Sequence, residues 1–215
     1  MGKDYKLDDP TIYDHIAPLL YTTYHKIFEK VGGDPVRAYL NAAIRTAQYT
    51  QQVYFGSVAG NVKKRWQLLG DILDDDTEVK SITDLKSVAV CSERAAVANN
   101  VLQILGFNPV LETGQLDAEG TPQPEAHVFL FIQGSNGEEH LYDPTNPQPY
   151  YDSEGNLLET APALYPAGNA LSMRSEPVTG QHKTYRIQQD GSVEVTEIRN
   201  MKFTLSPNGT ELHPY

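Results

Sequence analysis

Residues 91–107 read CSERAAVANNVLQILGF, and the sequence changes its periodicity immediately after this stretch. Within it, apolar residues recur three or four positions apart, as they do on one face of a helix. The residues of this face are Val97, Val101, Leu102 and Leu105. Gly106 stands where helices commonly end on a glycine. We therefore predict a helix over residues 91–105 with Cys91 in its first turn.

The chain ahead of this helix is also predicted to be helical. An aromatic-rich helix is expected over residues 11–31, and a second helix begins after Asp34, a good N-cap, with Pro35 at the first helical position. A third helix is expected over residues 58–73, where apolar residues keep the same period. Three basic residues fall on its other faces and are expected to be solvated, namely Lys63, Lys64 and Arg65.

Beyond residue 107 the apolar period becomes two, which is typical of strands. Strands are predicted at residues 109–116, 126–133 and 139–143, the last two joined by a turn-rich segment. Residues 144–182 contain six prolines and little periodicity, so an irregular surface loop is expected there. The remaining residues read as hairpins around Asp190-Gly191 and Asn208-Gly209.

These elements predict an α+β fold in which the Cys-headed helix packs on an antiparallel sheet. A chain of 215 residues with 40% hydrophobic composition is long enough for one buried core, so a single domain is expected over residues 1–215. Its predicted parts are a helical N-terminal part (1–80), a core (81–145), the irregular loop (144–182) and C-terminal hairpins (183–215).

The charge balance limits the classes of partner. The chain carries 17 Lys and Arg against 28 Asp and Glu, a formal net charge of -11, which repels phosphate backbones and anionic lipid heads. Neither nucleic acid nor a membrane is therefore expected as a partner. A single cysteine cannot form an internal disulfide, and the first residues lack an apolar segment, so a cytoplasmic location is expected. The acidic run Asp74-Asp75-Asp76 lacks the ligand spacing of a calcium loop, and no metal is predicted.

Three residues form a candidate catalytic set. The Cys91 thiol at a helix N-terminus meets unpaired N–H groups and the positive end of the helix dipole, which favour the thiolate. His127 opens one predicted strand and Asp143 ends the next, so antiparallel pairing would bring them side by side. The imidazole would then take the thiol proton, and the carboxylate would orient the imidazole.

Each of these residues also has a purely structural interpretation. Cys91 is equally a small buried hydrophobe, His127 a strand-end histidine, and Asp143 the first residue of an Asp-Pro-Thr turn. His140 is a second candidate base, weaker because its neighbours are charged and its place on the short strand directs it elsewhere. The order of a Cys-headed helix, a His strand and an Asp strand favours the catalytic interpretation.

The sequence resembles the transglutaminase-like superfamily of papain-type Cys/His/Asp enzymes over roughly residues 82–145. The matching motifs, in the family's order, are CSERA at 91–95 on a helix that ends at Gly106, AHV at 126–128, and LYDPT at 141–145. Two positions depart from the family pattern, which bears on the subfamily more than on the three residues. Val90 stands where the family commonly has Gly, and Val128-Phe129 stand where an aromatic residue, often Trp, commonly follows the histidine.

The resemblance implies a cysteine protease, amidase or transglutaminase-type acyltransferase with the catalytic triad Cys91, His127 and Asp143 and with no cofactor. The thiol would attack an amide of a protein or peptide substrate to form a thioester. Water would then give proteolysis or deamidation, and an amine would give a crosslink. The Cys91 N–H would be one oxyanion donor, and candidates for a second are Gln51, Gln52 and Trp66. The alternative is a binding module that keeps this fold without turnover.

Overall fold

The protein has a mixed α/β structure that divides into two compact units, Met1–Phe107 and Asn108–Tyr215. The computed structural model describes residues 5–56, 63–65, 67–68, 80–134, 137–168 and 176–206. Helices dominate the first unit and a β-sheet forms the second. This agrees with the predicted α+β class, whereas the packing of the Cys-headed helix on the sheet and the single domain stay predictions.

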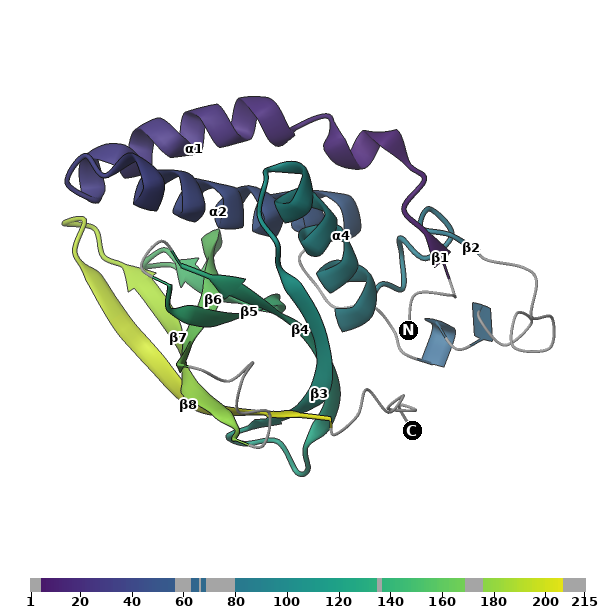
Figure 1. The fold of residues 1–215 in the computed structure, drawn as a ribbon. Helices are drawn as coiled ribbons and strands as arrows, with labels where there is room; N and C mark the ends of the chain where they lie inside the picture. Colours follow the sequence, from purple (N-terminus) through teal and green to yellow (C-terminus); the bar gives the residue numbers. More distant parts are fainter. Residues whose placement is uncertain are drawn as a thin grey trace. The chain divides into compact units, whose positions relative to one another are not determined.

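Helices make up most of what the structure describes of the first unit (Figure 1). A short 3-10 helix, η1 (Pro10–Tyr13), precedes α1 (Ile16–Lys30), so the expected helix over residues 11–31 is present but interrupted before Ile16. Helix α2 (Pro35–Phe55) begins as predicted, since the Asp34 carboxylate accepts hydrogen bonds from the backbone N–H groups of Val36 and Arg37, both at 3.0 Å.

Helix α4 (Cys91–Ile104) confirms the helix predicted from the opening stretch. Its inward face is fully buried, at Ala95, Val97, Ala98, Val101 and Leu102. Helix α2 presents small, fully buried residues to its neighbours, namely Ala38, Ala42, Ala43 and Ala47. Small side chains let helix axes approach closely, which packs α2 against both α1 and α4. A two-residue strand β1 (Tyr5–Lys6) pairs in parallel with β2 (Lys80–Ser81) and ties the chain's start to this unit.

The sheet of the second unit closes into a barrel. Its strands are β3 (Val110–Ala118), β4 (Glu125–Gln133), β5 (Glu139–Tyr151), β6 (Leu157–Gly168), β7 (Val178–Ile187) and β8 (Val193–Leu205). They run in the order β4-β3-β8-β7-β5-β6, and β5 also pairs with β4, which closes the ring. Apolar side chains fill its interior, including Phe129, Phe131, Tyr165 and Phe203.

Strand β5 makes this closure possible because it changes neighbours along its length. Its first residues pair with β4, and Tyr150 and Tyr151 pair with β7. Between these two stretches, the register against β6 shifts from Asp143 to Gln148. Such irregularities bend a strand and re-aim its side chains. Asp143 therefore lies at the bend of β5.

The irregular loop predicted for residues 144–182 is wrong. Strand β5 continues to Tyr151, β6 occupies Leu157–Gly168, and β7 begins at Val178. The prediction took the six prolines as a sign of irregular structure. Proline is nevertheless compatible with strands at bulges and edges, where its missing N–H is not needed. Pro144 and Pro147 lie within the bulge of β5, and Pro162 and Pro166 lie on β6, the last strand in the order.

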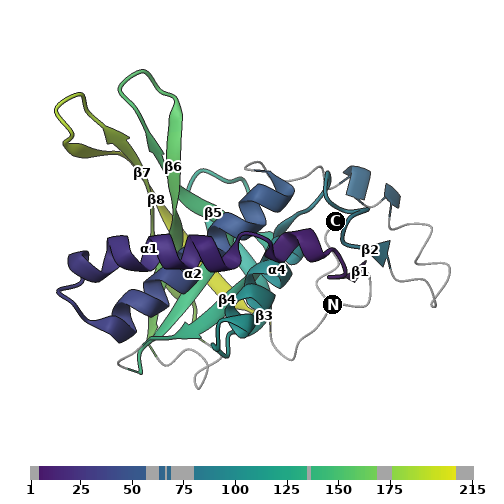
Figure 2. The same ribbon diagram turned by 90° about the horizontal axis from the view of Figure 1, so that it is seen from above.

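The predicted hairpins agree with the structure in part. Strands β4 and β5 form the expected hairpin, and β7 and β8 form the one around Asp190-Gly191. Figure 2 shows the β5–β6 and β7–β8 hairpins extending away from the rest of their sheet. Strand β8 runs unbroken to Leu205, so the residues expected to start a further hairpin belong to it. The turn around Asn208-Gly209 and most of the predicted helix over 58–73 lie outside the described residues.

Candidate active site

Two of the three predicted site residues meet in the second unit. Strands β4 and β5 are antiparallel, with Leu130 opposite Tyr142, so the side chains of His127 and Asp143 come to neighbouring positions on one face. His127 Nε2 lies 3.0 Å from Asp143 Oδ1. The carboxylate is fully buried, and the imidazole is 7% exposed. The prediction that these strands bring the histidine and the aspartate side by side is confirmed.

The Asp143 carboxylate is held by more than the histidine. The backbone N–H of Thr145 donates to Oδ1 at 3.0 Å, and the side-chain amide of Asn146 donates to Oδ2 at 2.8 Å. Burial by itself raises the pKa of Asp143, but the charge and hydrogen bond of His127, with the donors of Asn146 and Thr145, hold it below its ordinary value. The group is therefore an anion whose two oxygens point in defined directions.

The ring of His127 is also fixed by its apolar surroundings. Its centroid lies 6.4 Å from that of Phe129 and 6.3 Å from that of Phe203. These rings restrict the imidazole from the barrel side, while Asp143 engages Nε2. The imidazole therefore lies between a carboxylate and two aromatic rings, which together define its orientation.

Cys91 lies in the first unit, at the first residue of α4, and is partly exposed. The residue before it, Val90, has an extended backbone, and its N–H donates to the Glu93 carboxylate at 2.8 Å. This contact is one half of a capping box and defines where the helix begins. The predicted position of Cys91 at the helix N-terminus is confirmed, while its partnership with His127 stays a prediction.

The candidates for a second oxyanion donor have different surroundings. Gln51 is fully buried in α2, and its side-chain oxygen accepts a hydrogen bond of 2.7 Å from Arg94. Gln52 is partly exposed on the same helix, and Trp66 lies outside the described residues. Arg94 also donates to the Gly56 carbonyl at 2.9 Å, so Gln51 belongs to a polar cluster in the interior of the first unit.

His140 is placed away from the Asp143 carboxylate. It lies three residues earlier on β5, where alternate side chains point to opposite faces, and it stands opposite Ile132 of β4 and Pro166 of β6. The ion pair is formed by His127. The preference for His127 over His140 as the partner of Asp143 is confirmed.

Sequence reasoning missed two groups near these residues. Asn146, three positions after Asp143, was a recognisable signal, because an amide so placed can bond back to an aspartate in a turn. Arg65, expected on a solvated face, is instead buried and paired with Glu93 of α4. No local pattern shows that pairing, since the two residues are 28 positions apart.

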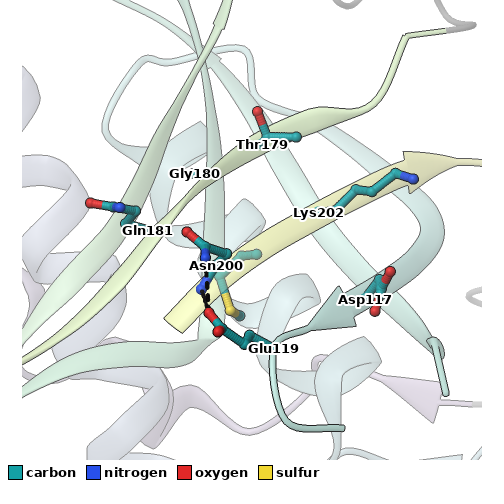
Figure 3. Close-up of a pocket in the computed structure, with 8 residues that line it drawn as sticks. Asp117, Glu119, Thr179, Gly180, Gln181, Asn200 and Lys202 are labelled. Atoms are coloured by element: carbon teal, nitrogen blue, oxygen red, sulfur yellow. Dashed lines mark hydrogen bonds between the residues drawn. The ribbon is translucent and has the colours of Figure 1, made fainter. Parts of the chain in front are cut away.

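A shallow depression of about 530 Å³ lies elsewhere on the second unit (Figure 3). Its lining comes from β3, β7, β8 and the residue after β3, and includes Asp117, Glu119, Gln181, Asn200 and Lys202. Glu119 and Asn200 are joined by a hydrogen bond of 2.8 Å between their side chains. Neither His127 nor Asp143 is among its lining residues.

In the part of the chain that the structure describes, no cluster of three or more His, Cys, Asp or Glu residues is arranged to hold a metal ion. None of the helices in these same residues has both the length and the apolar character needed to cross a membrane. Comparison of the chain with protein-family models, with curated proteins and with solved structures found no match in any of the three.

Proposed function

We propose that this protein is a cysteine enzyme of the transglutaminase-like type, which cleaves or transfers an acyl group from an amide of a protein or peptide. The observation that carries the proposal is the buried pair of His127 and Asp143, with Nε2 and Oδ1 3.0 Å apart. A carboxylate that lies 3.0 Å from an imidazole nitrogen and is fixed by hydrogen bonds from Thr145 and Asn146 is suited to be the orienting half of a triad. The nucleophile is Cys91, the chain's one cysteine.

The proposed chemistry gives each of the three residues one role. Asp143 engages Nε2 of His127, so Nδ1 is the nitrogen that would accept the proton of the Cys91 thiol. The thiolate sulfur attacks the amide carbonyl carbon, and the negative oxygen that forms is held in part by the Cys91 backbone N–H. The C–N bond then breaks, the imidazolium gives its proton to the departing amine or ammonia, and a thioester remains on Cys91.

The second half of the reaction determines the product. Water adds to the thioester, with His127 taking its proton, and releases a carboxylic acid and the free thiol. A primary amine adds in the same way and releases a new amide. On a glutamine side chain these outcomes are deamidation and transamidation, and on a main-chain amide the first is proteolysis.

The test is intact-mass analysis of a glutamine-containing peptide library incubated with the protein, with and without a primary amine. A gain of about one dalton indicates deamidation, a cleavage indicates proteolysis, and an amine adduct indicates transamidation. Cys91→Ala must abolish every product, and His127→Ala is expected to reduce the rate by roughly 10²–10⁴-fold, the usual contribution of a general base.

A parallel experiment separates an enzyme from a binding module of the same fold. Because the chain has one cysteine, the mass of the iodoacetamide-treated native protein reports on Cys91 alone. An activated thiol labels at pH 6.5, while an inert one labels only after unfolding. Bound peptides of unchanged mass together with an inert thiol would refute the enzyme and favour the binding module.

A further inference from the structure

A buried ion pair adjoins Cys91 within the first unit. Arg65 Nη2 lies 2.7 Å from Glu93 Oε1, and Arg65 Nε donates to the same oxygen at 3.0 Å. The Glu93 side chain has no exposed surface, and that of Arg65 is 7% exposed. Two hydrogen bonds from one guanidinium fix the direction of approach as well as the charge. The segment that carries Arg65 is therefore tied to the first turn of α4.

The same carboxylate holds the backbone and side chain on either side of the cysteine. Glu93 Oε2 accepts the N–H of Val90 at 2.8 Å, and Glu93 Oε1 accepts the Ser92 hydroxyl at 2.9 Å. The residues before and after Cys91 are thus bonded to one side chain. Any change in the position of this carboxylate changes the position of the helix start that carries the thiol.

The negative charge of Glu93 is compensated by the positive charge of Arg65. The Glu93 carboxylate is buried in the first turn of α4, and a buried anion disfavours any second negative charge near it, because like charges in a poorly solvated region repel strongly. The guanidinium of Arg65 offsets this charge at 2.7 Å. The other charged group on this turn, Arg94, is buried and directed to Gln51 and the Gly56 carbonyl.

Two further described cations, Lys63 and Lys64, directly precede Arg65 in the sequence, and both are exposed. Solvent and salt screen exposed charges of this kind. The proposed function adds one more group, the His127 imidazole, as the acceptor of the thiol proton.

We propose that Arg65 is a positioning residue for Cys91, whose pairing with Glu93 holds the helix start in place and balances the charge beside the thiol. The catalytic importance of this pairing rests on the proposed function. The effect of the pairing on Cys91 can be tested through the reactivity of the thiol, without a substrate.

The experiment follows the rate of iodoacetamide alkylation of Cys91 against pH in the full chain, by intact mass. Arg65→Met leaves the Glu93 anion unbalanced, so the midpoint of the profile should rise by roughly one pH unit. Glu93→Gln keeps the shape and leaves Arg65 unbalanced, so the midpoint should fall by a similar amount. The double variant removes both charges and should return near the wild-type midpoint.

Lys63→Met is the matched control, since it removes an exposed cation from the same segment and should move the midpoint by less than about 0.2 pH unit. A purely structural role would not reproduce the opposite shifts, because loosening of the helix start changes access to the thiol in the same direction in each variant. Circular dichroism confirms folding. If Arg65→Met does not fold, the proposal is tested by the other two variants: the midpoint of Glu93→Gln should fall, and that of the double variant should return near the wild-type value.

Folded variants with coincident midpoints would overturn the proposal, as would Glu93→Gln and Arg65→Met shifting in the same direction. The outcome of the alkylation experiment can be distinguished from the outcome of the peptide-library experiment. Opposite shifts without any peptide product refute the proposed function and leave the role of Arg65 intact. Peptide turnover with coincident midpoints refutes the role of Arg65 alone.

Discussion

Replacing Asp143 with asparagine removes the charge of the buried pair while preserving its shape. In the wild type the carboxylate lies 3.0 Å from His127 Nε2, and it also accepts three hydrogen bonds, from the backbone N–H groups of Thr145 and Asn146 and from the side-chain amide of Asn146. Removing one partner of a buried ion pair costs about 3–5 kcal/mol. Asparagine keeps one accepting oxygen but turns an N–H₂ group toward the donors, so we expect a loss of about 2–4 kcal/mol.

The loss is measurable as a fall in Tm. For a chain of this length, each kcal/mol corresponds to about 2–4 °C, so Asp143→Asn should melt about 4–16 °C below the wild type at pH 7. The assay is thermal unfolding followed by circular dichroism in the β-sheet region. Asp152→Asn is the matched control, because Asp152 makes a similar set of contacts with Asn156 and Glu154 but is only partly buried. Its effect on Tm should be much smaller.

The difference should also depend on pH. The pKa of Asp143 is lowered in the folded protein, whereas its unfolded value is about 4. The stabilisation is therefore fully present above about pH 4 and is lost as the pH falls through the folded-state value. The wild type and Asp143→Asn should converge in stability toward acid. Equal Tm values at pH 7, or a gap that persists unchanged in acid, would refute the assigned role of the carboxylate.

Three further predictions concern the surroundings of this pair. Asn146→Ala removes the 2.8 Å hydrogen bond to Asp143 and should slow peptide turnover several-fold. It should also lower the free energy of unfolding by about 1–3 kcal/mol, since the lost bond was made to a charged group. Unchanged kinetics would contradict this. His140→Ala should leave turnover within about twofold, because the Asp143 carboxylate pairs with His127; a loss as large as that of His127→Ala would identify the wrong base. Gly180→Ala should lower the free energy of unfolding by about 1–3 kcal/mol, and Tm by several degrees, because a methyl group there would overlap the ring of Tyr165. A wild-type Tm would show that Tyr165 and the neighbouring strands move to accommodate the methyl group.

The local elements of the first unit could be predicted well from the sequence. The start of α2 is predictable because the Asp34 carboxylate and the Pro35 ring act on backbone groups within one helical turn. The apolar spacing after Cys91 predicts α4. The His127 and Asp143 pair was also predictable, because a short Gly-containing turn forces the two strands that carry these residues into antiparallel neighbours. In each case the interaction is local or follows from one hairpin.

The second unit shows where such reasoning fails. Residues 144–182 were expected to be irregular because prolines lack the N–H that a central strand needs. Whether a proline harms a strand depends on whether that N–H faces a partner, which is a property of the assembled sheet. Here the bulge of β5 and the outer strand β6 accommodate the prolines, and the same bulge turns Asp143 toward His127.

The sequence by itself determined helices α2 and α4, the β4–β5 and β7–β8 hairpins, and the order in which the cysteine, histidine and aspartate appear. These properties depend on contacts within a few residues or across one turn. Only the tertiary structure decided that the sheet closes through β5, that Asn146 completes the anchoring of Asp143, and that Arg65 is buried against Glu93. Closure and burial depend on side chains far apart in the chain meeting away from water, and no local pattern of residue types encodes which of them will meet.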